Sequence, residues 1–145
     1  MKQERIYKTI LNGDKSEVLS ISLEVLLKTI PSSVYRDLNW ALLWFEAMVS
    51  NKFVYDLLPF ENEIKNSSNG KLFSFEELLE LSQEIKQGIE ILIIADPDQN
   101  NLRKYESDEE MQKICFLTAE LVDSSYWEIS TRSEQLISIL KQDLD

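Results

Sequence analysis

Residues 89–95 read Ile-Glu-Ile-Leu-Ile-Ile-Ala, and this stretch decides the fold class. Its length and its β-branched content are typical of a strand buried in the centre of a sheet. Just before it, Ser74 and Glu77 fit a capping box, which predicts the start of an amphipathic helix. Gly88 suits the C-cap of a helix that ends near Gln87. A capped helix that leads into a buried strand indicates a domain built from both kinds of element.

Downstream of this strand, the chain predicts two more strands and a closing helix. Residues 114–122 and 126–130 have strand composition. Between them, residues 123–125 (Asp-Ser-Ser) predict a tight turn in which the Asp123 side chain bonds backbone amides. Thr131 fits the N-cap of the closing helix, which completes this half of the chain.

Upstream, three further elements are expected. Residues 4–11 are rich in strand formers, and residues 17–30 carry apolar positions at helical spacing until Pro31 stops the pattern. Periodicity does not separate strand from helix over residues 38–49, but their aromatic content favours a strand. Residues 50–72 read as an irregular, exposed loop.

The whole chain therefore predicts one α+β domain over residues 1–145. Its 145 residues, 43% hydrophobic and 28% charged, are typical of one globular domain. We expect a single mixed, mostly antiparallel sheet of about five or six strands, with three helices that cover it mainly on one side.

Missing residue types exclude several classes of chemistry. The chain has no histidine, so Ser-His-Asp, Cys-His and His-ligated zinc sites are excluded. Its three glycines are too scattered for a phosphate-binding loop, and its one cysteine, Cys115, is interpreted as a core thiol. We expect no cofactor and no metal.

The charge and hydropathy pattern indicates a soluble protein of the cytoplasm. No apolar run is long enough to cross a bilayer, and the N-terminal residues lack a signal-peptide pattern. The formal net charge is -11, which disfavours direct nucleic-acid binding and would attract a basic protein surface. Solubility alone is a second explanation of such a charge. No membrane partner and no oligomeric state are predicted.

Two groups of residues are candidates for partner binding. The first is acidic and comprises Asp96, Asp98, Glu106, Asp108, Glu109 and Glu110. The second is aromatic: Trp40, Trp44, Tyr126 and Trp127 could form a binding platform, because aromatic side chains dominate interface hot spots. Of the pair Tyr126 and Trp127, one side chain should be exposed on an alternating strand.

The acidic group invites two other interpretations. Asp96, Asp98 and Asn100 alternate as at the start of a calcium loop, but Asn101 and Ser107 occupy positions where that loop needs glycine and glutamate. A calcium site is therefore not expected. A catalytic carboxylate pair is conceivable without histidine, although the abundance of acids singles out no particular pair.

From Leu38 onward the sequence resembles an uncharacterised family of small Bacillus-type bacterial proteins, a domain of unknown function. The features that carry this resemblance are Asn39-Trp40, Leu57-Leu58-Pro59, the strand residues 91–96 and the segment 122–129 ahead of a terminal helix. The size, the acidity and the order of elements are also similar to those of immunity proteins of bacterial toxin systems, which bind and block basic toxins. No catalytic residue transfers from either resemblance.

Three functional hypotheses follow. The leading one is a non-catalytic bacterial protein-binding domain, an immunity-type inhibitor of a basic partner. The second is a nucleic-acid mimic, which needs carboxylates at phosphate-like spacing on one face. The third is a histidine-free enzyme that uses carboxylates.

Overall fold

In the computed structural model, which describes residues 5–13 and 21–144, six strands form one antiparallel sheet. The strands are β1 (Tyr7–Leu11), β2 (Asn39–Val49), β3 (Lys71–Phe73), β4 (Ile85–Asp96), β5 (Leu117–Val122) and β6 (Tyr126–Thr131). Their order is β1-β6-β5-β4-β2-β3, so β4 lies inside the sheet as residues 89–95 predicted. The α+β class and the single sheet are confirmed, and the described strands pair only antiparallel, without the parallel pairs of a mixed sheet.

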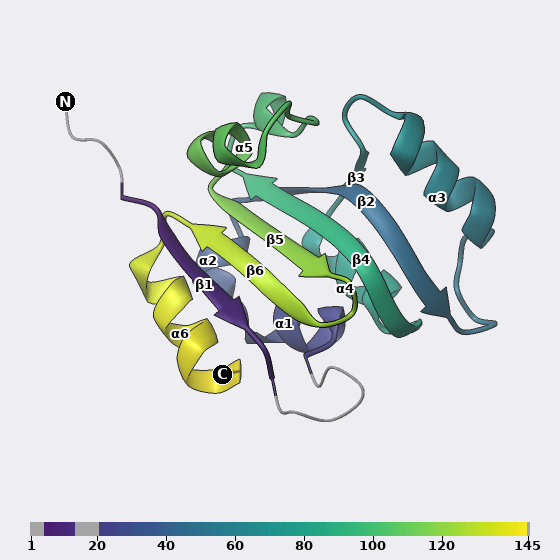
Figure 1. The fold of residues 1–145 in the computed structure, drawn as a ribbon, viewed down its shortest axis with the longest axis horizontal. Coiled ribbons are helices and arrows are strands. Elements are labelled where there is room, and N and C mark those ends of the chain that lie inside the picture. Colours follow the sequence, from purple (N-terminus) through teal and green to yellow (C-terminus); the bar gives the residue numbers. More distant parts are fainter. Residues whose placement is uncertain (1–4, 14–20, 145) are drawn as a thin grey trace.

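Six α-helices accompany the sheet in the described residues, whereas three were expected. They are α1 (Leu23–Thr29), α2 (Ser32–Tyr35), α3 (Leu57–Asn66), α4 (Phe75–Ser82), α5 (Asp108–Ile114) and α6 (Glu134–Leu144). A single 3₁₀ turn, η1 (Gln99–Asn101), follows β4. Figure 1 shows α1, α2, α4 and α6 behind the sheet, α3 beside β2, and α5 at one end of the central strands.

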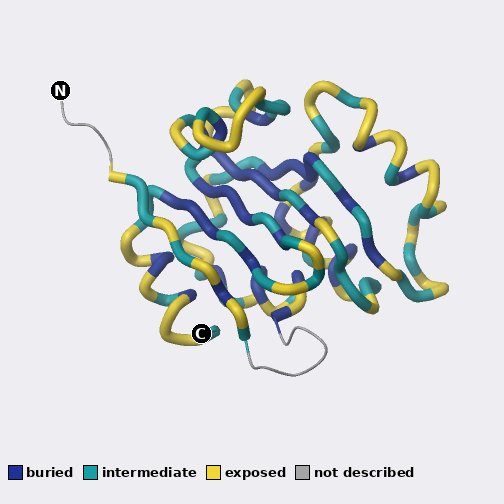
Figure 2. The backbone as a smooth tube through the Cα atoms, in the orientation of Figure 1, coloured by how far each residue is buried: buried dark blue, intermediate teal, exposed yellow. Residues whose placement is uncertain are grey.

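Two hydrophobic cores lie on opposite faces of the sheet. The larger one joins the strands to α1, α3, α4 and α6, and it contains Trp40, Trp127 and Leu136 at 1% exposure or less. The smaller one lies under α5 and η1 and includes Ile94, Met111 and the buried thiol of Cys115. Figure 2 shows the central strands as the most deeply buried part of the chain. None of the helices in residues 5–13 and 21–144 covers the rest of the second face.

The boundary between α4 and β4 differs from the prediction. The capping box is present, since Glu77 N donates to Ser74 Oγ at 3.1 Å and Ser74 N donates to Glu77 Oε1 at 2.9 Å. The helix nevertheless ends at Ser82, and β4 begins at Ile85. Gly88 is therefore a strand residue, and a Cβ there would meet Leu121 Cδ2 at 2.6 Å. Pairing with β2 and close packing against β5 override the local C-cap signal.

The predicted strand over residues 114–122 begins later, at Leu117. Its first residue ends helix α5, whose N-cap Ser107 accepts a hydrogen bond from Glu110 N at 3.1 Å. The Arg132 guanidinium donates to the carbonyls of Lys113 and Ile114 at the other end of this helix. Arg132, which directly follows β6, thus donates to carbonyls that the short helix leaves without partners.

Residues 50–72 contain helix α3 and strand β3, so the prediction of an irregular loop is wrong. The buried side chains of α3 are Phe60 and Ile64, one turn apart, which pack against the aromatic residues of β2. Lys104 Nζ donates to the carbonyls of Ile64 and Lys65 at 2.6 and 2.7 Å. Because distant groups stabilise this helix, its own sequence predicts it only weakly.

Two helices begin at residues other than those predicted. Residues 17–20 of the expected first helix lie outside the described residues, and α1 begins only after its N-cap Ser22. Before α6, the cap is Ser133 rather than Thr131, because Leu136 N donates to Ser133 Oγ at 3.0 Å. Thr131 is still paired within β6.

The β5–β6 hairpin has the tight connection that was predicted, for a different reason. Asp123 and Ser124 have φ angles of 49° and 58°, and Ser125 N donates to Val122 O at 2.9 Å. Ser124 also docks the turn on β4, through its Oγ to Gly88 O at 3.0 Å. No described hydrogen bond uses the Asp123 carboxylate, so we attribute its suitability to the tolerance of aspartate for positive φ.

We expect Asp123→Ala to lower the free energy of unfolding by about 1 kcal/mol and Asp123→Gly to leave it unchanged or raise it. Glycine adopts positive φ without strain, whereas alanine does not. Chemical denaturation of both variants measures the difference. If glycine were as destabilising as alanine, a lost side-chain hydrogen bond would be the better explanation.

Candidate binding surface on the open sheet face

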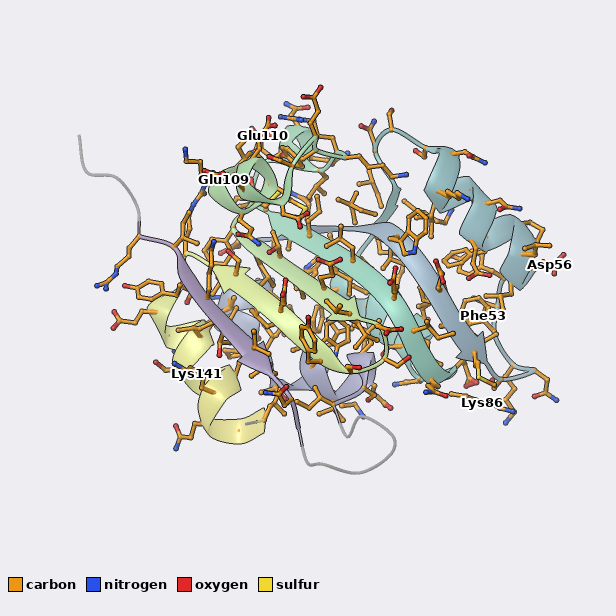
Figure 3. All side chains as sticks on the ribbon, viewed as in Figure 1. Phe53, Asp56, Lys86, Glu109, Glu110 and Lys141 are labelled. Atoms are coloured by element: carbon orange, nitrogen blue, oxygen red, sulfur yellow. The ribbon has the colours of Figure 1, made fainter. Side chains whose placement is uncertain are left out.

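Strand alternation gives the sheet an open face, which lies opposite α1, α4 and α6 and beyond the end covered by α5. The side chains on it come from β1, β2, β4, β5 and β6 (Figure 3). They are Lys8, Ile10, Trp44, Glu46, Glu90, Leu92, Glu120, Val122, Tyr126 and Glu128.

Four glutamates dominate this open face. Glu46 of β2 is directly opposite Glu90 of β4, and Glu120 of β5 is directly opposite Glu128 of β6. Like charges at such cross-strand positions destabilise a sheet by about 0.2–1 kcal/mol per pair. Their placement therefore works against stability.

No described cation forms an ion pair with any of these four glutamates. The ion pairs of the described chain are Lys28–Glu24, Lys71–Glu63 and Arg103–Glu110. Lys104 is directed to carbonyls at the end of α3. None of these four glutamates is therefore neutralised by an ion pair within the described residues.

The carboxyl group of Glu120 lies among other acids and is partly buried. Partial burial raises its pKa, and the charges of Asp108, Glu128 and Glu90 raise it further. These three acids belong to α5, β6 and β4, so they surround Glu120 from three elements. On the β2 side, burial raises the pKa of Glu61, and the charge of Glu46 adds to this effect.

Two shallow hollows flank the Glu120–Glu128 pair. The Trp44 hollow, of about 300 Å³, is lined by Trp44, Glu90, Ile91, Leu92 and Glu120. The Ile10 hollow, of about 510 Å³, is lined by Lys8, Thr9, Ile10, Gln112, Glu128 and Ile129. The open face therefore combines carboxylates with concave apolar surface.

Trp44 is held in a fixed orientation at the edge of this surface. Its Nε1 donates to Glu46 Oε1 at 2.9 Å. Lys65 Nζ, from α3, lies 5.9 Å from the centre of the indole ring. A half-exposed indole with its polar atom satisfied presents a preorganised aromatic surface.

The sequence-predicted acids separate into buried and exposed members. Asp96 is 3% exposed and accepts hydrogen bonds from Asp98 N, Asn101 Nδ2 and Phe116 N at 2.8–3.0 Å. It joins the end of β4 to η1 and β5. The Asp98 carboxylate accepts from Asn100 N at 2.9 Å as the cap of η1. Both side chains hold the chain together at this end of the sheet, and Asp96 is not accessible to a partner.

Glu106 precedes the N-cap Ser107 of α5, and Asp108, Glu109 and Glu110 lie within this helix. Asp108, Glu109 and Glu110 form its first turn, where negative charge is favourable, and Glu110 pairs with Arg103 at 3.8 Å. Glu109 and Glu110 are labelled at the top of Figure 3. Because the charge of Asp108 acts on Glu120, this turn extends the acidic surface of the open face.

Tyr126 and Trp127 point to opposite faces, as the alternation predicted. Trp127 is fully buried, and its Nε1 donates to Ile21 O at 2.8 Å. Tyr126 is half-buried on the open face. Only Tyr126 of this pair is available to a partner.

The four open-face glutamates were not among the candidates predicted from the sequence, and Trp44 was named only as one of four aromatic residues that could form a binding platform. Each of these glutamates stands between two apolar residues of its strand, which is a visible signal of a face exposed to solvent. What the sequence lacked was the strand order, which brings the four strands together. Among the described residues, no group of three Cys, Asp or Glu side chains has the geometry of a metal site.

Comparison with known proteins gives no relative: no protein family, curated protein or solved structure matches this chain. None of the helices in the described residues has the length and apolar character needed to cross a membrane.

We expect Glu120→Gln to raise the free energy of unfolding by about 0.5 kcal/mol at pH 7. A raised pKa means that the folded state disfavours the ionised carboxylate. The gain should be complete above the raised pKa and should disappear as the pH falls to the ordinary value for glutamate. Denaturation between pH 4 and 8 measures it, with Glu106→Gln, an exposed acid with no described partner, as the control. Equal, pH-independent effects of both variants would contradict this assignment.

Proposed function

We propose that the protein is a non-catalytic bacterial binding protein of the cytoplasm, whose open sheet face engages a basic protein partner in the manner of an immunity-type inhibitor. One observation carries the proposal: four neighbouring strands present glutamates without a described ion pair on the part of a sheet face that no described helix covers. The net charge of -11 supports fast, electrostatically steered association with a basic surface.

The proposal explains why destabilising like-charge pairs are present. Surfaces selected for binding keep residues that oppose folding stability, because their energy is recovered in the complex. The acidic first turn of α5 and half-buried Tyr126 border the same surface, so both predicted groups contribute to it.

The test compares two variants with the same change in net charge. The face variant carries Glu90→Gln, Glu120→Gln and Glu128→Gln. The control carries Glu76→Gln, Glu80→Gln and Asp143→Asn, three exposed acids on α4 and α6, which pack on the other side of the sheet. The expected result is that the wild type and the control capture the same basic protein from the host or from co-expression with the neighbouring gene product, and that the face variant binds it at least tenfold more weakly.

Salt provides the second measurement. Binding by the wild type should weaken steeply between low and physiological ionic strength. A partner that binds the face variant and the wild type equally well would contradict the proposal, and so would the absence of any protein partner at low salt.

A nucleic-acid mimic is the second candidate. The two glutamate pairs lie on four strands whose neighbours are about 4.8 Å apart, so the carboxylates form a band rather than a scatter over loops. In that case, the captured partner would be a nucleic-acid-binding protein, and an oligonucleotide would compete with the wild type for it. Carboxylate catalysis is the third candidate, for which Glu120 with Glu90 in the Trp44 hollow would be the acid pair.

A further inference from the structure

We infer that the Trp44 hollow receives an arginine side chain of the basic partner. This inference rests on the proposed function and names the group that anchors the partner. Its lining combines three chemistries: the indole ring of Trp44, the apolar side chain of Leu92, and the carboxylates of Glu90 and Glu120. The side chain of Ile91, which also borders the hollow, is buried in the larger core on the other face of the sheet.

The size of the hollow fits one long side chain. Its volume of about 300 Å³ lies at the lower end of the range for small-molecule pockets, which is roughly 300–1,000 Å³. It is also open rather than enclosed, whereas small ligands are usually surrounded over most of their surface. A side chain that projects from a macromolecular surface satisfies both conditions.

The chemistry of the lining selects a guanidinium over an ammonium. A guanidinium is planar and weakly hydrated, so it can stack on an aromatic ring while it donates hydrogen bonds to carboxylates at its edge. An ammonium is strongly hydrated and lacks a flat surface. Trp44 and the glutamates Glu90 and Glu120 line the same hollow, so one planar cation can contact both kinds of group.

The indole already attracts a cation within this chain. Lys65 Nζ lies over the Trp44 ring at 5.9 Å, but Lys65 does not line the hollow. Helix α3, which carries Lys65, packs against β2, whereas the hollow extends over β4 and β5. Since Glu46 fixes the indole through its Nε1, the side of the ring toward β4 is preorganised for a second cation.

The environment of Glu120 gives an electrostatic reason why a cation should occupy the Trp44 hollow. Its carboxylate has acids on three sides and no described counterion, so a cation in the hollow relieves repulsion that the free protein carries. The apolar side chain of Leu92 can contact the methylene stem of arginine.

The experiment uses N-acetyl-arginine methylamide as the probe and N-acetyl-lysine methylamide as its matched control. Both are titrated into ¹⁵N-labelled protein while the indole N–H resonances are followed. Trp40 and Trp127 are buried, so only the Trp44 resonance should shift. We expect the arginine probe to bind at least threefold more tightly than the lysine probe, and Glu90→Gln with Glu120→Gln to remove the arginine-specific shift. Glu80→Gln, on α4, should leave it unchanged.

The outcomes separate this inference from the proposed function. Equal shifts with both probes, or an arginine shift that survives the double substitution, would overturn the arginine anchor. If the partner still requires the open-face glutamates in that case, the proposed function stands without it. If the arginine probe binds as expected but the face variant captures the partner normally, the proposed function fails while the hollow remains a guanidinium site.

Discussion

Replacing Gly70 with alanine is expected to lower the free energy of unfolding by about 3 kcal/mol. Gly70 has a φ of 67°, which alanine adopts only with strain. A Cβ at this position would also overlap the carbonyl oxygen of Leu42 and would lie 2.9 Å from Leu43 Cδ2. The carbonyl belongs to the backbone of β2 beside its pairing with β3, so it cannot move aside without disturbing the sheet.

The control for this substitution is Asn69→Ala in the same loop. Asn69 is exposed and does not have a positive φ, so its replacement should change stability by less than about 0.5 kcal/mol. Urea denaturation of the two variants and the wild type measures both effects. A Gly70→Ala variant as stable as Asn69→Ala would show that the β2–β3 junction relaxes freely, which contradicts the rigid contact described above.

Trp127→Phe is expected to be destabilising by about 2–3 kcal/mol, and Trp40→Phe by clearly less. Both indoles are almost fully buried, at 0% and 1% exposure. Trp127 Nε1 donates to Ile21 O at 2.8 Å, so phenylalanine would leave a buried carbonyl without its partner. Trp40 Nε1 has no hydrogen-bond partner in the described chain, so phenylalanine there removes an unsatisfied donor.

The comparison is informative because both substitutions remove the same atoms from the same core. The difference in unfolding free energy therefore isolates the hydrogen bond that holds residue 21, ahead of α1, to β6. It is measured by chemical denaturation, with near-ultraviolet circular dichroism to confirm that both variants keep a packed core. Equal losses would mean that Trp40 Nε1 has a partner, such as a buried water molecule.

Much of the sheet could be predicted from local pattern, because strongly apolar strands carry their own signal. Residues 89–95 are the clearest case, whereas β2 was predicted from its aromatic content and β6 from its strand composition. The short elements could not be predicted, since α3 and α5 are stabilised by distant groups, Lys104 and Arg132. These contacts cannot be inferred from the residues adjacent to the helices in the sequence.

The candidate surface was only partly predictable for a related reason. The acids near residue 108 form a conspicuous run, and they do border the surface. Glu46, Glu90, Glu120 and Glu128 are single acids spread over 83 positions of sequence, and only the strand order unites them. Asp96 shows the opposite error: it was predicted as an accessible acid, whereas it is 3% exposed and accepts three hydrogen bonds.

Because side chains alternate along each strand, the buried core and the open face are built from two separate sets of sequence positions. In β5, for example, Leu117, Ala119 and Leu121 are buried in the larger core, while Glu120 and Val122 project the other way. Substitutions in the second set change the chemistry of the open face without repacking the first. Under the proposed function, a lineage that follows a changing partner could therefore exchange its open-face side chains while its scaffold stays constant, and a laboratory library confined to those positions should yield folded variants.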